Sequence, residues 1–128
     1  MHGNRKKDDR NTPILPIGAV AKILKVHQRT LRIYDEQGIL VPKRSSTNKR
    51  LYTLNDVEVG RFILFLTRNL AVNLAGVKII LTVAQKNQKL KPESYISRLK
   101  EISGLSDEEL DYNAKRLSTR GRRPASAI

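Results

Sequence analysis

The chain has 128 residues, with 25 Lys and Arg residues against 12 Asp and Glu residues, and its formal net charge at pH 7 is +13. A chain of this length forms one domain, or one domain with an appendage, and this disfavours the large cleft-bearing scaffold of most multi-substrate enzymes. The absence of cysteine excludes disulfides, thiolate metal sites and thiol redox sensing, whereas the positive charge points to a polyanion such as nucleic acid as the partner.

The first 13 residues are polar, carry both charges and end in Thr12-Pro13. This composition predicts a flexible N-terminal arm over residues 1–13. No apolar run in the chain approaches the roughly 18 residues needed to cross a bilayer, and no apolar segment follows the charged start. We therefore expect a cytoplasmic protein that does not insert into membranes.

Two short helices are predicted next. In the first, apolar residues recur at i, i+3, i+4 and i+7, namely Ile17, Val20, Ala21 and Leu24. The second begins at Gln28 and stops at Gly38, which adopts the left-handed conformation at a helix end without steric cost. The break between them is about three residues long, and the second helix is rich in Arg, Gln and Thr. This arrangement is typical of a helix-turn-helix, in which the second helix reads DNA.

Helical spacing also predicts which face of the second helix meets DNA. Leu31 and Tyr34 supply the inward face, whereas the polar residues near the N-terminal half lie outward, namely Gln28, Arg29 and Arg32. Arg can bind guanine and Gln can bind adenine through two hydrogen bonds each, so residues 28 and 29 are the candidates for base readout. Arg32 fits better as a phosphate anchor.

A β-hairpin follows, with residues 40–44 and 50–52 as short extended runs around the polar turn 45–49. Asn48 suits a left-handed turn position. The hairpin has four basic residues, namely Lys43, Arg44, Lys49 and Arg50. We interpret it as a wing whose basic side chains contact the DNA backbone, with a charged solvent loop as the alternative.

Two further helices carry apolar stripes that we assign to the core. Thr53 is the predicted N-cap of a helix that runs to about Asn69, and Asn73 is the predicted cap of the next one. After Pro92, another apolar stripe has helical spacing, at Tyr95, Ile96, Leu99 and Ile102. Either a second subunit covers this stripe, as a dimerisation surface, or these helices pack onto the domain.

A last helix, with a capping box at residues 106–109, is predicted to run to about Leu117. The basic residues 119–128 are predicted to form a disordered tail. The sequence thus predicts a mainly α-helical protein: an arm (1–13), a winged helix-turn-helix domain with a small hairpin (14–86), a C-terminal helical region for dimerisation or a partner (87–118), and a tail (119–128).

The order of these elements and their residues resemble the MerR family of winged helix-turn-helix transcription regulators. The resemblance covers roughly residues 14–85 and rests on three motifs, namely Ile17-Gly18-x-x-Ala21, Arg29-Thr30-Leu31-Arg32-x-Tyr34-Asp35-x-x-Gly38-Ile39-Leu40 and Arg50-Leu51-Tyr52-Thr53-x-x-Asp56. Within the family, residues 26–27, residues 30–34 and above all residues 66–77 look like the HspR heat-shock repressor branch.

This resemblance implies a homodimer that represses stress and chaperone genes from an inverted-repeat DNA operator at the bacterial nucleoid, with a DnaK-type chaperone as a possible co-repressor. Carried over by position, base contacts fall on His27, Gln28 and Arg29, and backbone contacts on Arg32, Lys43, Arg44, Lys49, Arg50 and Tyr52. His27 stands where many relatives have a Ser N-cap, which leaves its capping contact open. The lone His27 suits a turn or a DNA contact better than a metal site, and we expect no cofactor.

Three alternatives remain open at this stage. A MerR-like activator or a DNA-bending factor would use the same fold. An RNA- or ribosome-associated protein would explain the charge, but the chain lacks the aromatic platform on which single-stranded RNA stacks. An enzyme is the weakest class, because neither a phosphate-binding glycine loop nor a nucleophile motif occurs in the sequence.

Overall fold

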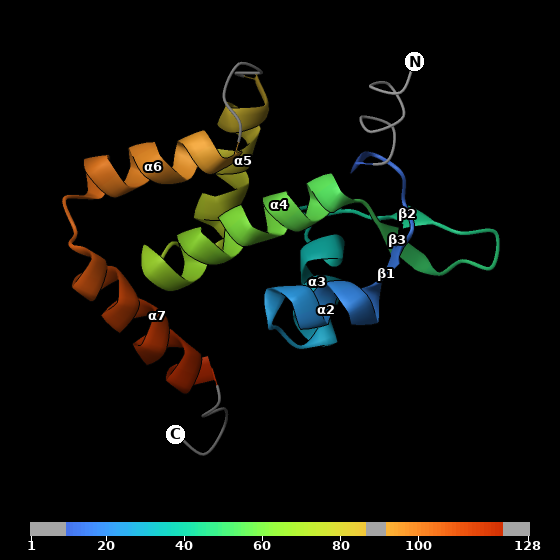
Figure 1. Cartoon of the computed structure of the whole chain (residues 1–128), viewed down its shortest axis with the longest axis horizontal. Helices are drawn as coiled ribbons and strands as arrows, with labels where there is room; N and C mark the ends of the chain where they lie inside the picture. Colours follow the sequence, from blue (N-terminus) through green and yellow to red (C-terminus); the bar gives the residue numbers. More distant parts are fainter. Residues whose placement is uncertain (1–9, 87–91, 122–128) are drawn as a thin grey trace. The chain divides into compact units, whose positions relative to one another are not determined.

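A computed structural model describes residues 10–86 and 92–121 of the chain (Figure 1). Its elements follow in the order β1 (Leu15–Pro16), α2 (Ile17–Leu24), α3 (Gln28–Glu36), β2 (Lys43–Arg44), β3 (Arg50–Tyr52), α4 (Leu54–Leu64), the π-helical turn η1 (Phe65–Asn69), α5 (Leu74–Lys86), α6 (Pro92–Ser103) and α7 (Asp107–Gly121). This order confirms the predicted mainly α-helical class with a small hairpin. The described residues form two compact units, and the division falls between Arg61 and Phe62, within α4.

Helices α2 and α3 form the predicted helix-turn-helix in the first unit, and their apolar faces are buried. The turn starts at Lys25, which has a left-handed φ of 57° and donates its N–H to the carbonyls of Ala21 and Lys22. Gly60 of α4 lies against α2, because a Cβ at this position would come within 2.7 Å of Leu24 Cδ1. A glycine at residue 60 therefore allows α4 to approach α2 this closely.

The three strands form one antiparallel sheet in the order β1-β3-β2. In β1, Leu15 is opposite Tyr52, and in β2, Arg44 is opposite Arg50. The sequence predicted the hairpin but not β1, because two residues are too few to show an alternating pattern. The first wing strand is also shorter than expected: it starts after Pro42, which has no N–H to donate to a neighbouring strand.

The turn of the hairpin is held by its own polar groups. Asn48 has a φ of 64°, which confirms the predicted left-handed turn position. Ser45 Oγ accepts the backbone N–H groups of Thr47 at 3.3 Å and Lys49 at 3.0 Å. These bonds close the turn locally.

The predicted helix caps are present. Thr53 and Asp56 form a capping box in which each backbone N–H donates to the other's side chain at 2.9 Å. Ser106 and Glu109 form a second box, with the Glu109 N–H 3.1 Å from Ser106 Oγ. Asn73 Oδ1 accepts a backbone N–H three residues later at 2.8 Å. Each cap satisfies a donor that the first helical turn leaves open.

The second unit is built around η1. The helix that the sequence predicted up to Asn69 is α-helical to Leu64 and then widens into this π-helical turn. Helix α7 packs against η1. Asn69 Nδ2 donates to the carbonyl of Leu110 at 2.9 Å, and Asn113 Nδ2 donates to the carbonyl of Asn69 at 3.1 Å. Side-chain amides therefore join α7 to a turn more than 40 residues earlier.

The predicted segment boundaries stay predictions, because residues 1–9, 87–91 and 122–128 lie outside the described residues. Arg10 Nε donates to Asn55 Oδ1 at 3.4 Å, and the Asn11 side chain accepts from the same amide. Helix α7 continues to Gly121, four residues past the end expected near Leu117. None of the helices in the described ranges has the length and apolar character needed to span a membrane.

Candidate nucleic-acid interface

Helix α3 separates a core face from a polar face as predicted. Leu31 and Tyr34 are buried, whereas Arg29 and Arg32 are exposed and Gln28 is half-buried. Arg32 Nη2 donates to Gln28 Oε1 at 3.1 Å, one helical turn away. The Arg29 guanidinium has neither a hydrogen bond nor an ion pair with any residue in the described ranges. The first turn of α3 therefore presents an unpaired cation beside a side-chain amide held by Arg32.

His27 is the N-cap of α3. Its Nδ1 accepts the backbone N–H of Arg29 at 3.0 Å, which is the contact that a Ser hydroxyl makes at many helix starts. The sequence left this contact open because a His ring can cap a helix in only a narrow range of side-chain orientations. The structure has His27 in such an orientation, at the exposed start of α3.

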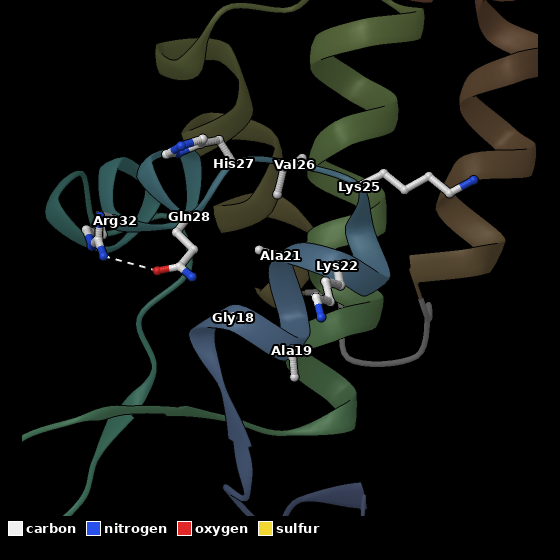
Figure 2. A pocket seen from close by; sticks show the side chains of 9 residues that line it. All are labelled: Gly18, Ala19, Ala21, Lys22, Lys25, Val26, His27, Gln28 and Arg32. Carbon is white, nitrogen blue, oxygen red and sulfur yellow. Dashed lines mark hydrogen bonds between the residues drawn. The ribbon is translucent and has the colours of Figure 1, made fainter.

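A groove of about 930 Å³ lies where α2 meets α3. Figure 2 shows Lys22 and Lys25 on its α2 side, with Gln28 and Arg32 on the α3 side. The sequence-based site did not include Lys22 and Lys25. Their position on the polar side of the first helix was visible in the sequence, but only the fold brings them to the same groove as Gln28. Both lysines add positive charge to this groove, although the end of the Lys25 side chain extends away from Gln28 in Figure 2.

The wing contains two kinds of basic residue. Lys43 and Lys49 are exposed. Arg44 and Arg50 instead form ion pairs with Asp35 of α3: Arg50 Nε lies 2.8 Å, and Arg44 Nη2 3.2 Å, from Asp35 Oδ2. The sequence predicted all four as backbone contacts and missed Asp35. The available signals were its place in the family motif after Tyr34 and its acidic charge in the last helical turn, where the helix dipole disfavours it.

Tyr52 does not fit the predicted backbone contact. Its side chain is 0% exposed in the core of the first unit, and its hydroxyl has no hydrogen-bond partner among the described residues. Burial raises the pKa of this hydroxyl above its ordinary value of 10.0, because the phenolate would be desolvated. Side chains alternate between the two faces of a strand, and Tyr52, opposite Leu15 of β1, is on the face that the core covers.

The predicted dimerisation stripe lies on α6 in the second unit. Ile102 is 75% exposed, and Ile96 and Leu99 are half-buried. The Tyr95 side chain lies outside the described residues. On α5, Ile79 and Val83 are also exposed, at 66% and 59%. Apolar side chains at this level of exposure mark surface that a partner could cover.

No group of three or more His, Asp or Glu side chains in the described ranges is arranged to hold a metal ion. The site instead consists of the first turn of α3, the basic groove and the hairpin. A helix-turn-helix beside an exposed basic hairpin is the architecture of winged helix-turn-helix DNA-binding proteins.

Residues 15–83 match the family described as MerR HTH family regulatory protein. The chain belongs to this family, and it is therefore a DNA-binding transcriptional regulator of the MerR type. The match extends from β1 into α5, so it includes the complete candidate interface.

Similar proteins include two transcriptional regulators and one heat shock protein. The HTH-type transcriptional regulator GlnR of Bacillus anthracis is 29% identical over 113 residues, covering 86% of this chain and 87% of GlnR. The heat shock protein HspR of Streptomyces coelicolor is 31% identical over 94 residues, covering 71% of this chain and 62% of HspR. A homologue of the regulator ZntR from Haemophilus influenzae is 32% identical over 107 residues, covering 83% and 70% of the two chains. The predicted resemblance to the MerR family, with HspR among its relatives, is confirmed.

Proposed function

We propose that this regulator is a homodimeric repressor that binds an inverted-repeat operator in duplex DNA and controls stress or chaperone genes. The observation that carries the DNA-reading part is the first turn of α3, where the unpaired Arg29 guanidinium lies beside Gln28 and the basic groove. Arg and Gln at the start of a recognition helix can each form two hydrogen bonds with one base. In this proposal, base contacts come from His27, Gln28 and Arg29.

The backbone contacts in this proposal come from exposed cations on both sides of the reading helix. Lys43 and Lys49 of the wing and Lys22 and Lys25 of the groove have exposed side chains, and such contacts set affinity and register without reading sequence. Arg32, Arg44 and Arg50 can contribute through the guanidinium nitrogens that their internal bonds leave open.

The heat-shock part of the proposal rests on similarity to HspR, which is named as a heat shock protein. A DnaK-type chaperone as co-repressor belongs to the same proposal, as does a location at the nucleoid in the cytoplasm. A catalytic activity is not part of it, because the named relatives are regulators.

DNase footprinting of the full chain on a promoter fragment recovered by genome-wide binding tests the proposal. A homodimer should protect two half-sites on one DNA face, with centres one helical turn (~34 Å) or a multiple apart. Protection of a single half-site contradicts the homodimer. In vitro transcription from that fragment then separates repression from activation or DNA bending, and preference for duplex RNA over duplex DNA contradicts DNA reading altogether.

A further inference from the structure

The last turn of α3 contains a carboxylate that the proposed base and phosphate contacts do not use. The side chain of Asp35 is only 13% exposed, and a nearly buried carboxylate is costly unless it is paired. Asp35 also lies at the helix end where the dipole disfavours negative charge, and no basic residue occupies that turn of the helix. Its local surroundings on α3 therefore do not account for an acidic residue at this position.

The partners of Asp35 come from both wing strands. Arg50 of β3 and Arg44 of β2 donate to the same oxygen, Oδ2, at 2.8 Å and 3.2 Å. These two arginines are directly opposite each other in the β2–β3 ladder. Like charges at opposite positions destabilise an antiparallel pair, so a carboxylate bonded to both removes a repulsion within the wing.

Arg44 extends this connection to the turn. Its Nη1 donates to the carbonyl of Asn48 at 3.3 Å, while its Nη2 bonds to Asp35. The turn around Asn48 is closed by Ser45. A chain of hydrogen bonds thus runs from the turn of the wing, through Arg44, to Asp35 of α3.

We propose that Asp35 is a positioning residue that fixes the wing to the reading helix, so that the two meet DNA in one register. Asp35 lies seven residues after Gln28, which is about two helical turns along the same side of α3. The first turn of α3 is then available to contact bases, while Asp35 in its last turn binds the wing. The consequence for sequence discrimination rests on the proposed function.

The test measures two affinities for each full-length variant. The probes are a duplex that the wild-type protein selects from a random-sequence library and a scrambled duplex of the same composition. For Asp35→Asn, we expect the ratio of the two dissociation constants to fall at least tenfold. Affinity for the scrambled duplex should stay equal or rise, because a negative charge is lost and two arginines are released.

Glu36→Gln is the matched control, since it removes the same charge from the next residue, which is exposed and takes no part in the two ion pairs. Its ratio should equal that of the wild type. Partial unfolding lowers both affinities by the same factor and leaves their ratio unchanged. A loss of folded protein therefore cannot produce the expected fall in the ratio. Asp35→Glu keeps the charge with a longer side chain, and its ratio should lie between those of wild type and Asp35→Asn.

A ratio for Asp35→Asn within twofold of the wild type overturns the inference. If the wild-type protein selects no sequence, the proposed function fails instead, and a DNA-free measurement then decides on Asp35. Trypsin should cut the hairpin 43–50 faster in Asp35→Asn than in Glu36→Gln, even though urea unfolds the two variants at the same concentration. Equal cutting rates overturn the attachment of the wing.

Discussion

At the start of α3, the two nitrogens of the His27 ring have different surroundings. Nδ1 accepts the Arg29 N–H, so the neutral ring carries its proton on Nε2. The ring is exposed, and it offers Nε2–H as a donor. If His27 contacts DNA, its partner is then an acceptor, such as a phosphate oxygen or the N7 and O6 atoms of guanine.

Replacement of His27 by Ala should lower the free energy of unfolding by about 1 kcal/mol, because the N-cap acceptor is lost. His27→Ser supplies a hydroxyl acceptor at the same position and should keep most of that stability. Urea unfolding of both variants without DNA checks the prediction. Equal stability of the Ala and Ser variants would show that the cap contributes nothing.

Arg29 and Lys49 should differ in what their removal does to DNA binding. Arg29→Ala should reduce discrimination between the selected and scrambled duplexes by ~1–3 kcal/mol, because a base contact carries sequence information. Lys49→Ala should weaken binding to both duplexes and reduce the slope of log affinity against log salt by about one unit. Titrations at several salt concentrations measure both quantities, and identical effects of the two changes would remove the base-reading role of Arg29.

At the scale of elements, local patterns predicted the helices and their caps, while the sheet depended on pairing between distant segments. The faces of α2 and α3 follow from helical spacing alone, so Leu31 and Arg29 could be assigned from sequence. Strand β1 pairs with β3 some 37 positions later, and no local pattern encodes that pairing. The burial of Tyr52 depends on this pairing, and the ion pairs of Asp35 depend on how the hairpin packs against α3, so neither could be assigned from local patterns.

The buried hydroxyl of Tyr52 in β3 gives a prediction for Tyr52→Phe. The change removes a buried hydroxyl without a hydrogen-bond partner among the described residues, so the free energy of unfolding should stay equal or rise by up to about 1 kcal/mol. DNA affinity should not change. A loss of affinity at unchanged stability would instead support the backbone contact expected from the sequence.

The raised pKa of Tyr52 adds a pH dependence. Below pH 10 the hydroxyl is protonated in both the folded and the unfolded chain. Above that pH the unfolded chain ionises first, because burial raises the pKa only in the folded state, so stability is lost as pH rises. Tyr52→Phe has no hydroxyl to ionise at this position. Its free energy of unfolding, relative to that of the wild type, should therefore increase between pH 9 and pH 11.

At the scale of the whole molecule, the second unit has an apolar surface that is exposed in the single chain. Ile102 on α6 is 75% exposed, and Ile14, in the first unit, is 63% exposed. In the proposed dimer a second copy covers the stripe on α6, and Ile14 is an exposed apolar residue outside that stripe. The stripe on α6 is the one that the sequence predicted as a dimerisation surface.

Ile102→Asp should raise the dimer dissociation constant at least tenfold, which corresponds to about 1.4 kcal/mol, because a charge replaces an apolar side chain in the interface. Ile14→Asp is the control and should leave the dimer unchanged. Sedimentation equilibrium across a range of concentrations measures both. A wild-type monomer, or equal dissociation constants for all three proteins, would place dimerisation elsewhere or exclude it.

The strand order of the sheet has a consequence for synthesis on the ribosome. Strand β3 is the last of the three to emerge, yet it is the one to which both β1 and β2 pair. The reading helix is therefore complete while β1 and β2 still have unpaired edges, and the wing can take its place only after Tyr52 has left the exit tunnel. A nascent chain stopped before residue 50 would contain every predicted base-reading side chain without the β3 strand that pairs with β1 and β2.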